Sequence, residues 1–222
     1  MSRFFTGSSD KITFPVRANL NSAVSSTMTW CAWVYKTVDD STARRIIDPN
    51  GGSDQGFIIQ TPNGDFNVGI NHPTAAANAV YADALTANVW THLAFTWNVA
   101  NNRPLLFING LPVTATSGAD KSGTQAAWTG VSAIIGNRAG NDRVLSGRIA
   151  EWGIWNRVLK DSEIKPLGKG YSPRFIPNGL IMYYPLIGKN SPESDVKGDI
   201  PGVVTGAIAN SHPKVIYPRN FR

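Results

Sequence analysis

The chain has 222 residues, of which 42% are hydrophobic and 16% charged, against roughly 25% charged residues in an average soluble domain. A chain of this length can bury a full core without disulfides. It contains no run of about 18 apolar residues that could span a bilayer, and the segment Met1–Phe5 lacks the apolar region of a signal peptide. We therefore expect no membrane insertion and no signal peptide. The single cysteine, Cys31, excludes an intrachain disulfide and a multi-cysteine metal site.

The net charge of +6 raises the question of nucleic-acid binding. Residues 1–150 contain 11 Lys or Arg against 9 Asp or Glu, a net of +2, and residues 151–222 contain 10 against 6, a net of +4. Arg44-Arg45 is the only adjacent basic pair in the sequence. Because phosphate binding requires clustered cations, this dispersed charge predicts a mildly basic, solvated surface and no nucleic-acid partner.

Asn-Gly dipeptides mark several tight turns, because both residues adopt the positive φ angles that such turns require. Two of these dipeptides, Asn63-Gly64 and Asn109-Gly110, separate good candidate strands. The strands lie at Gly56–Thr61 and Asp65–Asn71 and at Arg103–Asn109 and Leu111–Thr114. The sequence therefore predicts two β-hairpins.

Two longer segments alternate with the period of a β-strand and are apolar on both faces. They are Thr27–Lys36 (TMTWCAWVYK) and Val89–Asn98 (VWTHLAFTWN). Strands of this kind are typical of the centre of a sheet that is covered on each side, by a facing sheet or by loops.

Further strands at Val131–Gly136 and Arg148–Asn156 bring the set to about ten, which predicts an all-β, two-sheet antiparallel sandwich. Lys160–Lys169 is the one segment predicted to be a short helix, limited to one or two turns by Pro166. Residues 172–222 are proline-rich and too few for a core of their own. We divide the chain into a domain of residues 1–171 and an extended C-terminal segment of residues 172–222, which packs on the sandwich or on a neighbouring subunit.

The order of several segments resembles a known family. These segments are TMTWCAWVYK, VWTHLAFTW, LLFINGLPV, AIIGNRAG and SGRIAEWGIWNRVLKDSEI. Over roughly residues 4–171 they are similar to a laminin-G-like module of the concanavalin A-like lectin/glucanase superfamily, which implies a jelly-roll sandwich. The run GYSPRFIPNGLIMYYPLIG, followed by GVVTGA and HPKVIYP, is similar to C-terminal extensions of such modules in tailed-bacteriophage proteins.

The superfamily that the chain resembles includes glycosidases, which need two carboxylates at a defined separation. Glu151, Glu163 and Glu193 are the only glutamates in the sequence, and none lies in the glutamate-x-aspartate-x-x-glutamate motif of the family's glucanases. Glu151 has no partner carboxylate at strand spacing, so we interpret it as a structural hydrogen-bond acceptor. Nucleophile-elbow, zinc-protease and dinucleotide motifs are also absent. We expect no catalytic residues and no enzymatic activity.

Calcium is the one cofactor that the resemblance implies, because loop Asp and Asn oxygens suit this cation. Positions that bind calcium in pentraxin-like members match Asp39, Asp40, Asn137, Asn141 and Asp142. Arg138 stands where an acidic ligand is expected, and a cation beside a dication costs Coulomb energy. The same Asp and Asn residues are also typical of turns, so both interpretations stay open.

Sugars stack on exposed aromatic rings, and this suggests candidate glycan-binding residues. Five tryptophans fall in predicted strands and are assigned to the core: Trp30, Trp90, Trp97, Trp152 and Trp155. Trp128 lies in a predicted loop and Tyr81 in a polar, Ala-rich segment. Trp128 and Tyr81 are therefore the candidates.

These observations and the resemblance together favour a non-enzymatic structural protein of a tailed-bacteriophage virion, as a capsid decoration, spike or fibre component. We expect it at the virion surface after assembly in the host cytoplasm. Its expected partners are other capsid or tail proteins, its own copies in a homo-oligomer, and host cell-surface polysaccharide. The alternative is a stand-alone, lectin-like carbohydrate-binding module, and a glycoside hydrolase is the third hypothesis.

Overall fold

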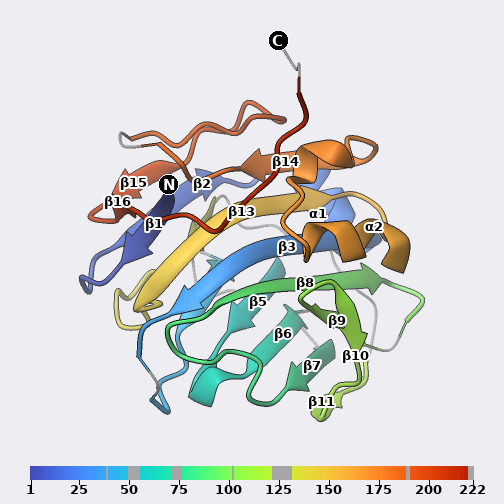
Figure 1. Cartoon of the computed structure of the whole chain (residues 1–222). Helices are drawn as coiled ribbons and strands as arrows, with labels where there is room; N and C mark the ends of the chain where they lie inside the picture. Colours follow the sequence, from blue (N-terminus) through green and yellow to red (C-terminus); the bar gives the residue numbers. More distant parts are fainter. Residues whose placement is uncertain are drawn as a thin grey trace.

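The computed structural model describes residues 1–38, 40–49, 56–71, 77–101, 103–121, 132–188 and 191–219. These residues form a sandwich of two antiparallel β-sheets, one in front and one behind in Figure 1. The predicted all-β, two-sheet sandwich is confirmed. No helix in the described ranges is long and apolar enough to cross a membrane.

Each sheet has eight strands within the described residues. Sheet A, the front sheet, runs in the order β10 (Leu111–Val113), β9 (Leu105–Ile108), β8 (Trp90–Asn98), β3 (Thr27–Lys36), β13 (Gly147–Trp155), β1 (Ser2–Phe5) and β16 (Ile208–Asn210), with β14 (Leu180–Tyr184) paired to the second half of β13. Sheet B runs in the order β11 (Ser117–Ala119), β7 (Ala77–Tyr81), β6 (Phe66–Asn71), β5 (Gly56–Gln60), β4 (Arg45–Pro49), β12 (Ser132–Ile135), β2 (Lys11–Pro15) and β15 (Val203–Thr205).

The two strands predicted to be central, β3 and β8, pair with each other along their whole length. Their inward side chains fill the space between the sheets, where the indole of Trp30 stacks on Phe95 with a centroid distance of 6.1 Å. Trp97 and Trp152 are also fully buried in this core. Trp90 is a correction: it begins β8 half-buried beside Tyr35, because the alternation of the strand turns it away from the facing sheet.

Both predicted hairpins are confirmed. Asn109 and Gly110 join β9 to β10 with φ angles of 51° and 80°. Asn63 and Gly64 join β5 to β6, also with positive φ angles, in a turn that includes the 3₁₀ helix η1 (Pro62–Gly64). The side-chain-free Gly110 tolerates this backbone region at no steric cost.

The described residues include an α-helix that the sequence did not predict. In addition to α2 (Asp161–Leu167), which lies within the predicted helical segment, residues Ala18–Ser25 form α1. Leu20 and Ala23 anchor α1 in the core. Its other positions are mainly Asn and Ser, which favour turns and caps over helix interiors, so its helical periodicity is weak.

The outward face of sheet A is apolar as well, and a second layer covers it. This layer consists of α2 and the 3₁₀ helix η2 (Pro173–Phe175), drawn in orange in Figure 1, and it packs on outward side chains of the sheet, including those of β14. A second hydrophobic cluster joins it to sheet A and comprises Cys31, Ala94, Phe107, Trp155, Leu159, Ile164, Leu167, Leu180 and Tyr183. The expectation that β3 and β8 are covered on both faces is therefore confirmed.

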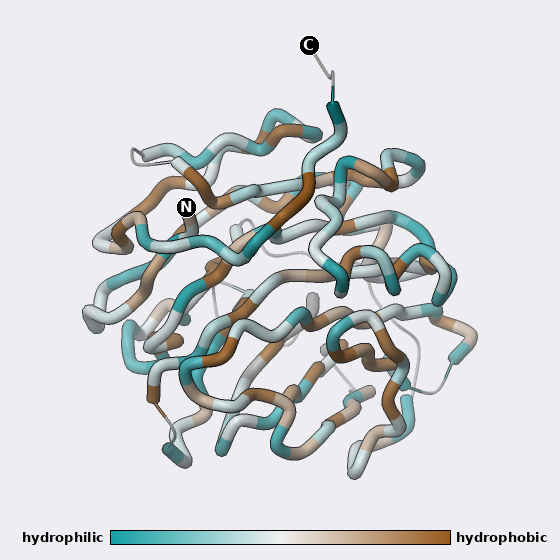
Figure 2. Tube along the Cα trace, in the orientation of Figure 1, coloured by the Kyte–Doolittle hydropathy of each residue, from teal (hydrophilic) through white to brown (hydrophobic). Residues whose placement is uncertain are grey.

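The C-terminal segment lies along the sandwich. After β14, it adds β15 beside β2 in sheet B and β16 beside β1 in sheet A. It then crosses the front of the molecule before the chain ends, as the red trace in Figure 1 shows. Hydrophobic stretches recur along this segment as they do along the central strands (Figure 2).

Glu151 of β13 fastens the C-terminal segment to sheet A. Its buried carboxylate accepts a hydrogen bond from the hydroxyl of Tyr183 at Oε2 and from the hydroxyl of Tyr217 at Oε1, each at 2.6 Å. His212 Nε2 lies 3.3 Å from Oε1. Burial and the nearby carboxylate raise the pKa of both tyrosines. Glu151 is therefore a hydrogen-bond acceptor, as its sequence context predicted.

Replacing Tyr217 by Phe removes one donor to this buried acceptor and should lower the free energy of unfolding by about 1 to 3 kcal/mol. Thermal unfolding followed by circular dichroism measures the change. Tyr81→Phe is the matched control, because no hydrogen bond of the Tyr81 hydroxyl is found within the described residues, and it should stay within about 0.5 kcal/mol of wild type. Equal stability of the two variants would contradict the role of Glu151.

Candidate functional site

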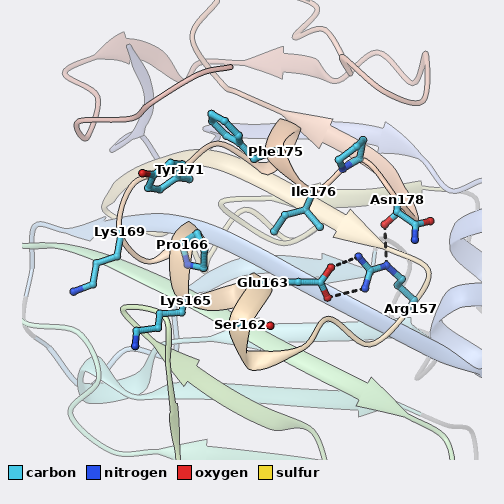
Figure 3. Close-up of a pocket in the computed structure, with 11 residues that line it drawn as sticks. Arg157, Ser162, Glu163, Lys165, Pro166, Lys169, Tyr171, Phe175, Ile176 and Asn178 are labelled. Atoms are coloured by element: carbon cyan, nitrogen blue, oxygen red, sulfur yellow. Dashed lines mark hydrogen bonds and ion pairs between the residues drawn. The ribbon is translucent and has the colours of Figure 1, made fainter. Parts of the chain in front are cut away.

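A cavity of about 730 Å³ opens on the outer layer of sheet A, between α2 and η2 (Figure 3). Its lining comes from α2, the turns on either side of α2, η2 and the turn before β14. The lining residues are Arg157, Ser162, Glu163, Lys165, Pro166, Lys169, Tyr171, Phe175, Ile176, Pro177 and Asn178. The apolar and aromatic members of this set are flanked by charged and amide side chains.

One wall of the cavity is α2, an amphipathic helix with a defined beginning. Glu163 Oε2 accepts a hydrogen bond from the backbone amide of Lys160 at 2.9 Å, which caps the first turn. Ile164 and Leu167, three residues apart, are buried against sheet A. This orientation leaves Lys165 exposed beside the cavity.

The position of α2 is fixed by close contact with the β9–β10 hairpin. A Cβ atom on Gly168 would lie 2.2 Å from the backbone nitrogen of Gly110, and one on Gly110 would lie 2.7 Å from the carbonyl oxygen of Lys165. No larger side chain fits at either position without a backbone shift. The end of α2 therefore rests directly on the predicted Asn109-Gly110 turn.

Arg157 and Glu163 form a bidentate ion pair at one end of the cavity, with N–O distances of 2.8 and 2.6 Å. Arg157 Nε also donates to the carbonyl oxygen of Asn178 at 2.8 Å, which links α2 to the turn before β14 (Figure 3). The guanidinium lowers the pKa of Glu163 to about 2. Glu163 is therefore a carboxylate at physiological pH, and its charge is matched by Arg157.

The opposite wall is held by the chain around Ile216, which follows β16 and forms an isolated β-bridge with Tyr171. The amide of Ser172 donates to the carbonyl oxygen of Ile216 at 3.0 Å, and the amide of Ile216 donates to that of Gly170 at 2.7 Å. These bonds present Tyr171 and Phe175 at the rim, where their rings pack edge to face with a centroid distance of 5.2 Å. The two residues are 39% and 41% exposed.

This arrangement suits a ligand that is apolar on one face and polar at its edges. Exposed rings can stack on the apolar face of such a ligand. Ser162 and Asn178 offer a hydroxyl and an amide, and Lys165 and Lys169 offer ammonium groups. Concave sites with an apolar lining and a few polar groups are the usual form of a small-molecule site.

Of the two glycan-binding residues predicted from the sequence, Tyr81 is not among the described residues that line this cavity. Tyr81 ends β7 in sheet B, half-buried against the main core and paired across the sheet with Phe66. Trp128 lies outside the described residues. Both residues stay predictions.

The predicted acidic calcium ligands are engaged by arginines wherever the structure describes them. Asp40 forms an ion pair with Arg44, which lowers the pKa of the Asp40 carboxyl. Asp142 forms a bidentate pair with Arg138, with both N–O distances at 2.5 Å. Asp39 lies outside the described residues. Arg138, the residue that the sequence marked as unfavourable for calcium, thus neutralises one of the proposed ligands.

The predicted amide ligands are also engaged. Asn137 is fully buried; its Oδ1 accepts from two backbone amides of its own loop, and its Nδ2 donates to the carbonyl oxygen of Ser8 at 2.7 Å. Asn141 accepts from Lys11 Nζ at 2.9 Å. In the described part of the chain these oxygens do not fit a ready-made calcium site, and no group of three or more His, Cys, Asp or Glu could hold a metal there. Calcium binding stays a prediction.

Sequence reasoning missed the aromatic rim. Tyr171 and Phe175 belong to the run GYSPRFIPN, in which the two aromatic residues are four positions apart beside prolines. This spacing alone does not distinguish a rim from a packed turn. The rim exists because Gly170 and Ser172 bond to Ile216, a contact between segments far apart in the sequence.

Comparison with known proteins identifies the fold independently. A laminin G family model, described as the concanavalin A-like lectin/glucanases superfamily, matches residues 6–165. No curated protein matches the sequence.

Solved structures share the fold at low sequence identity. A candidate carbohydrate-binding protein of Bacteroides ovatus matches with a TM-score of 0.66 and 17% identity, over 95% of this chain and 60% of that protein. The receptor-binding domain of a botulinum neurotoxin C/D mosaic matches with a TM-score of 0.61 and 16% identity, over 74% of this chain and 41% of that one. This chain thus corresponds to less than two thirds of either protein. The family match covers most of the chain, which therefore belongs to the concanavalin A-like lectin/glucanases superfamily.

Proposed function

We propose that this chain is a non-catalytic carbohydrate-binding module and that the cavity between α2 and η2 is its saccharide site. The observation that carries the proposal is the exposed ring pair of Tyr171 and Phe175 at the rim of a preformed cavity. A sugar ring can stack its C–H face on an aromatic ring while its hydroxyl groups bond to Ser162 and Asn178. Superfamily membership and the candidate carbohydrate-binding protein of similar fold support the proposal.

The carboxylates of the chain support binding without hydrolysis. Glu163 is the one carboxylate among the described lining residues, and its pKa of about 2 is too low for a general acid near neutral pH. Glu151 is occupied by two tyrosine hydroxyls, and Glu193 forms a buried ion pair with Arg3 at 2.5 Å. A glycosidase needs a second carboxylate across the sugar from the first, and the described lining offers none.

A glycan array of host cell-surface polysaccharides tests the saccharide site. The wild-type protein should bind at least one glycan, and Tyr171→Ala should weaken that binding about tenfold, which corresponds to about 1.4 kcal/mol of lost ring contact. Titration calorimetry with the array hit measures the change.

Tyr171→Phe is the matched control, because it keeps the ring and should retain binding. Tyr81→Ala and Trp128→Ala test the two positions predicted from the sequence. Failure of wild type to bind any glycan would contradict the function, whereas loss of binding in Trp128→Ala with full binding in Tyr171→Ala would move the site elsewhere.

A second proposal concerns where the protein works: we propose that it is a structural component of a tailed-bacteriophage particle, assembled from copies of itself with other capsid or tail proteins. The similarity of the C-terminal segment to phage extensions supports this role. Val203 on β15 and Ile208 on β16 add to it, since both are more than half exposed, at 56% and 55%, on strands at the edges of the two sheets. Exposed apolar edges favour pairing with another chain.

Light scattering of the purified protein tests the assembly. The mass should be a multiple of that of one chain, and Ile208→Lys should shift it towards the monomer, because a charge on an edge strand opposes pairing. Val89→Lys is the control, since Val89 is 49% exposed outside the strands of the sheets. A strictly monomeric wild type at high concentration would contradict the proposal.

A further inference from the structure

The charges around the cavity do not cancel. Among the described lining residues, Arg157 and Glu163 neutralise each other in their bidentate pair. Lys165 and Lys169 remain, and neither forms an ion pair within the described residues. The lining therefore carries three cations and one anion, a net of +2.

The two lysines lie together on one side of the cavity. In Figure 3 both lysines lie on the same half of the cavity as Tyr171, with their side chains extending outward from the cavity, while the Arg157–Glu163 pair occupies the other half. Both are exposed, so their ammonium groups stay hydrated and free to reorient towards a ligand. Because both side chains are exposed and flexible, their ammonium groups can turn towards the edge of a ligand stacked on Tyr171.

We propose that the saccharide bound in this cavity is acidic and that Lys165 and Lys169 receive its carboxylate or sulfate group. This inference rests on the proposed carbohydrate-binding function and adds the chemical class of the ligand. Two lysines act as point charges that accept either anion without the fixed fork geometry of arginine. The one arginine in the described lining is already held by Glu163, which leaves the lysines to supply recognition.

The test compares acidic saccharides with neutral counterparts. Tetragalacturonate is measured against its methyl ester, 3′-sialyllactose against lactose, and 3′-sulfolactose against lactose. We expect at least one acid to bind about tenfold more tightly than its neutral counterpart. Raising the ionic strength from about 0.05 M to 0.5 M should reduce this preference, because salt screens exposed charges. The first two pairs report on carboxylates and the third on sulfates.

Variants assign the preference to the two lysines. Lys165→Gln and Lys169→Gln should each weaken binding of the acid about two- to fivefold, as expected for an exposed ion pair, and should leave the neutral counterpart unchanged. Lys11→Gln, which removes the same charge from β2 in the other sheet, is the control and should retain the preference.

The outcomes separate this inference from the proposed function. Equal binding of acids and neutral counterparts, or a preference that survives in the double variant Lys165→Gln/Lys169→Gln, overturns the acidic-ligand inference while the saccharide site stands. Failure of every acid in the panel, together with a neutral hit on the glycan array, overturns it as well. Loss of all glycan binding by wild type overturns the proposed function itself.

Discussion

Burial of the outer face of sheet A is the constraint on which the rest of the structure depends. β3, β8 and β13 carry apolar side chains on both faces of sheet A. The core between the two sheets buries only the inward face. The other face needs a second layer, because each large apolar side chain left in water costs about 1.5 to 3 kcal/mol. Trp155 and Tyr183 are completely buried in this way. α2 and η2 form that layer, and the cavity lies between them.

The sequence could predict the features that depend on local pattern. The alternation of side chains in Thr27–Lys36 predicted β3 with the bounds that the structure shows. Asn109-Gly110 predicted a two-residue hairpin turn, because the positive φ angles of such a turn depend on these two residues alone. α1 could not be predicted, because two buried residues in a polar octapeptide give little periodicity. Neither could the rim of Tyr171 and Phe175, since it depends on a contact with a segment some 45 residues further along the chain.

The residues that line the cavity come partly from the region that matches the family and partly from the chain that follows it. The family match ends at residue 165, within α2, whereas Tyr171, Phe175 and Asn178 lie beyond it. The matched region supplies Arg157 and the α2 residues Ser162, Glu163 and Lys165 to the lining, and the following residues supply the aromatic rings. Membership of the superfamily therefore explains the platform, and the ligand must be argued from the residues that this chain adds to it.

Native-state hydrogen exchange tests most directly whether the outer layer is part of the sandwich. If burial of the outer face holds the layer in place, the amides at the end of α2, such as that of Gly168, which donates to the carbonyl oxygen of Ile164, should exchange through the same slow opening as those of β13. The cavity would then be preformed in the free protein. Exchange of these α2 amides several orders of magnitude faster than those of β13 would contradict this account, because it would mean that the layer opens independently of the sheet beneath it.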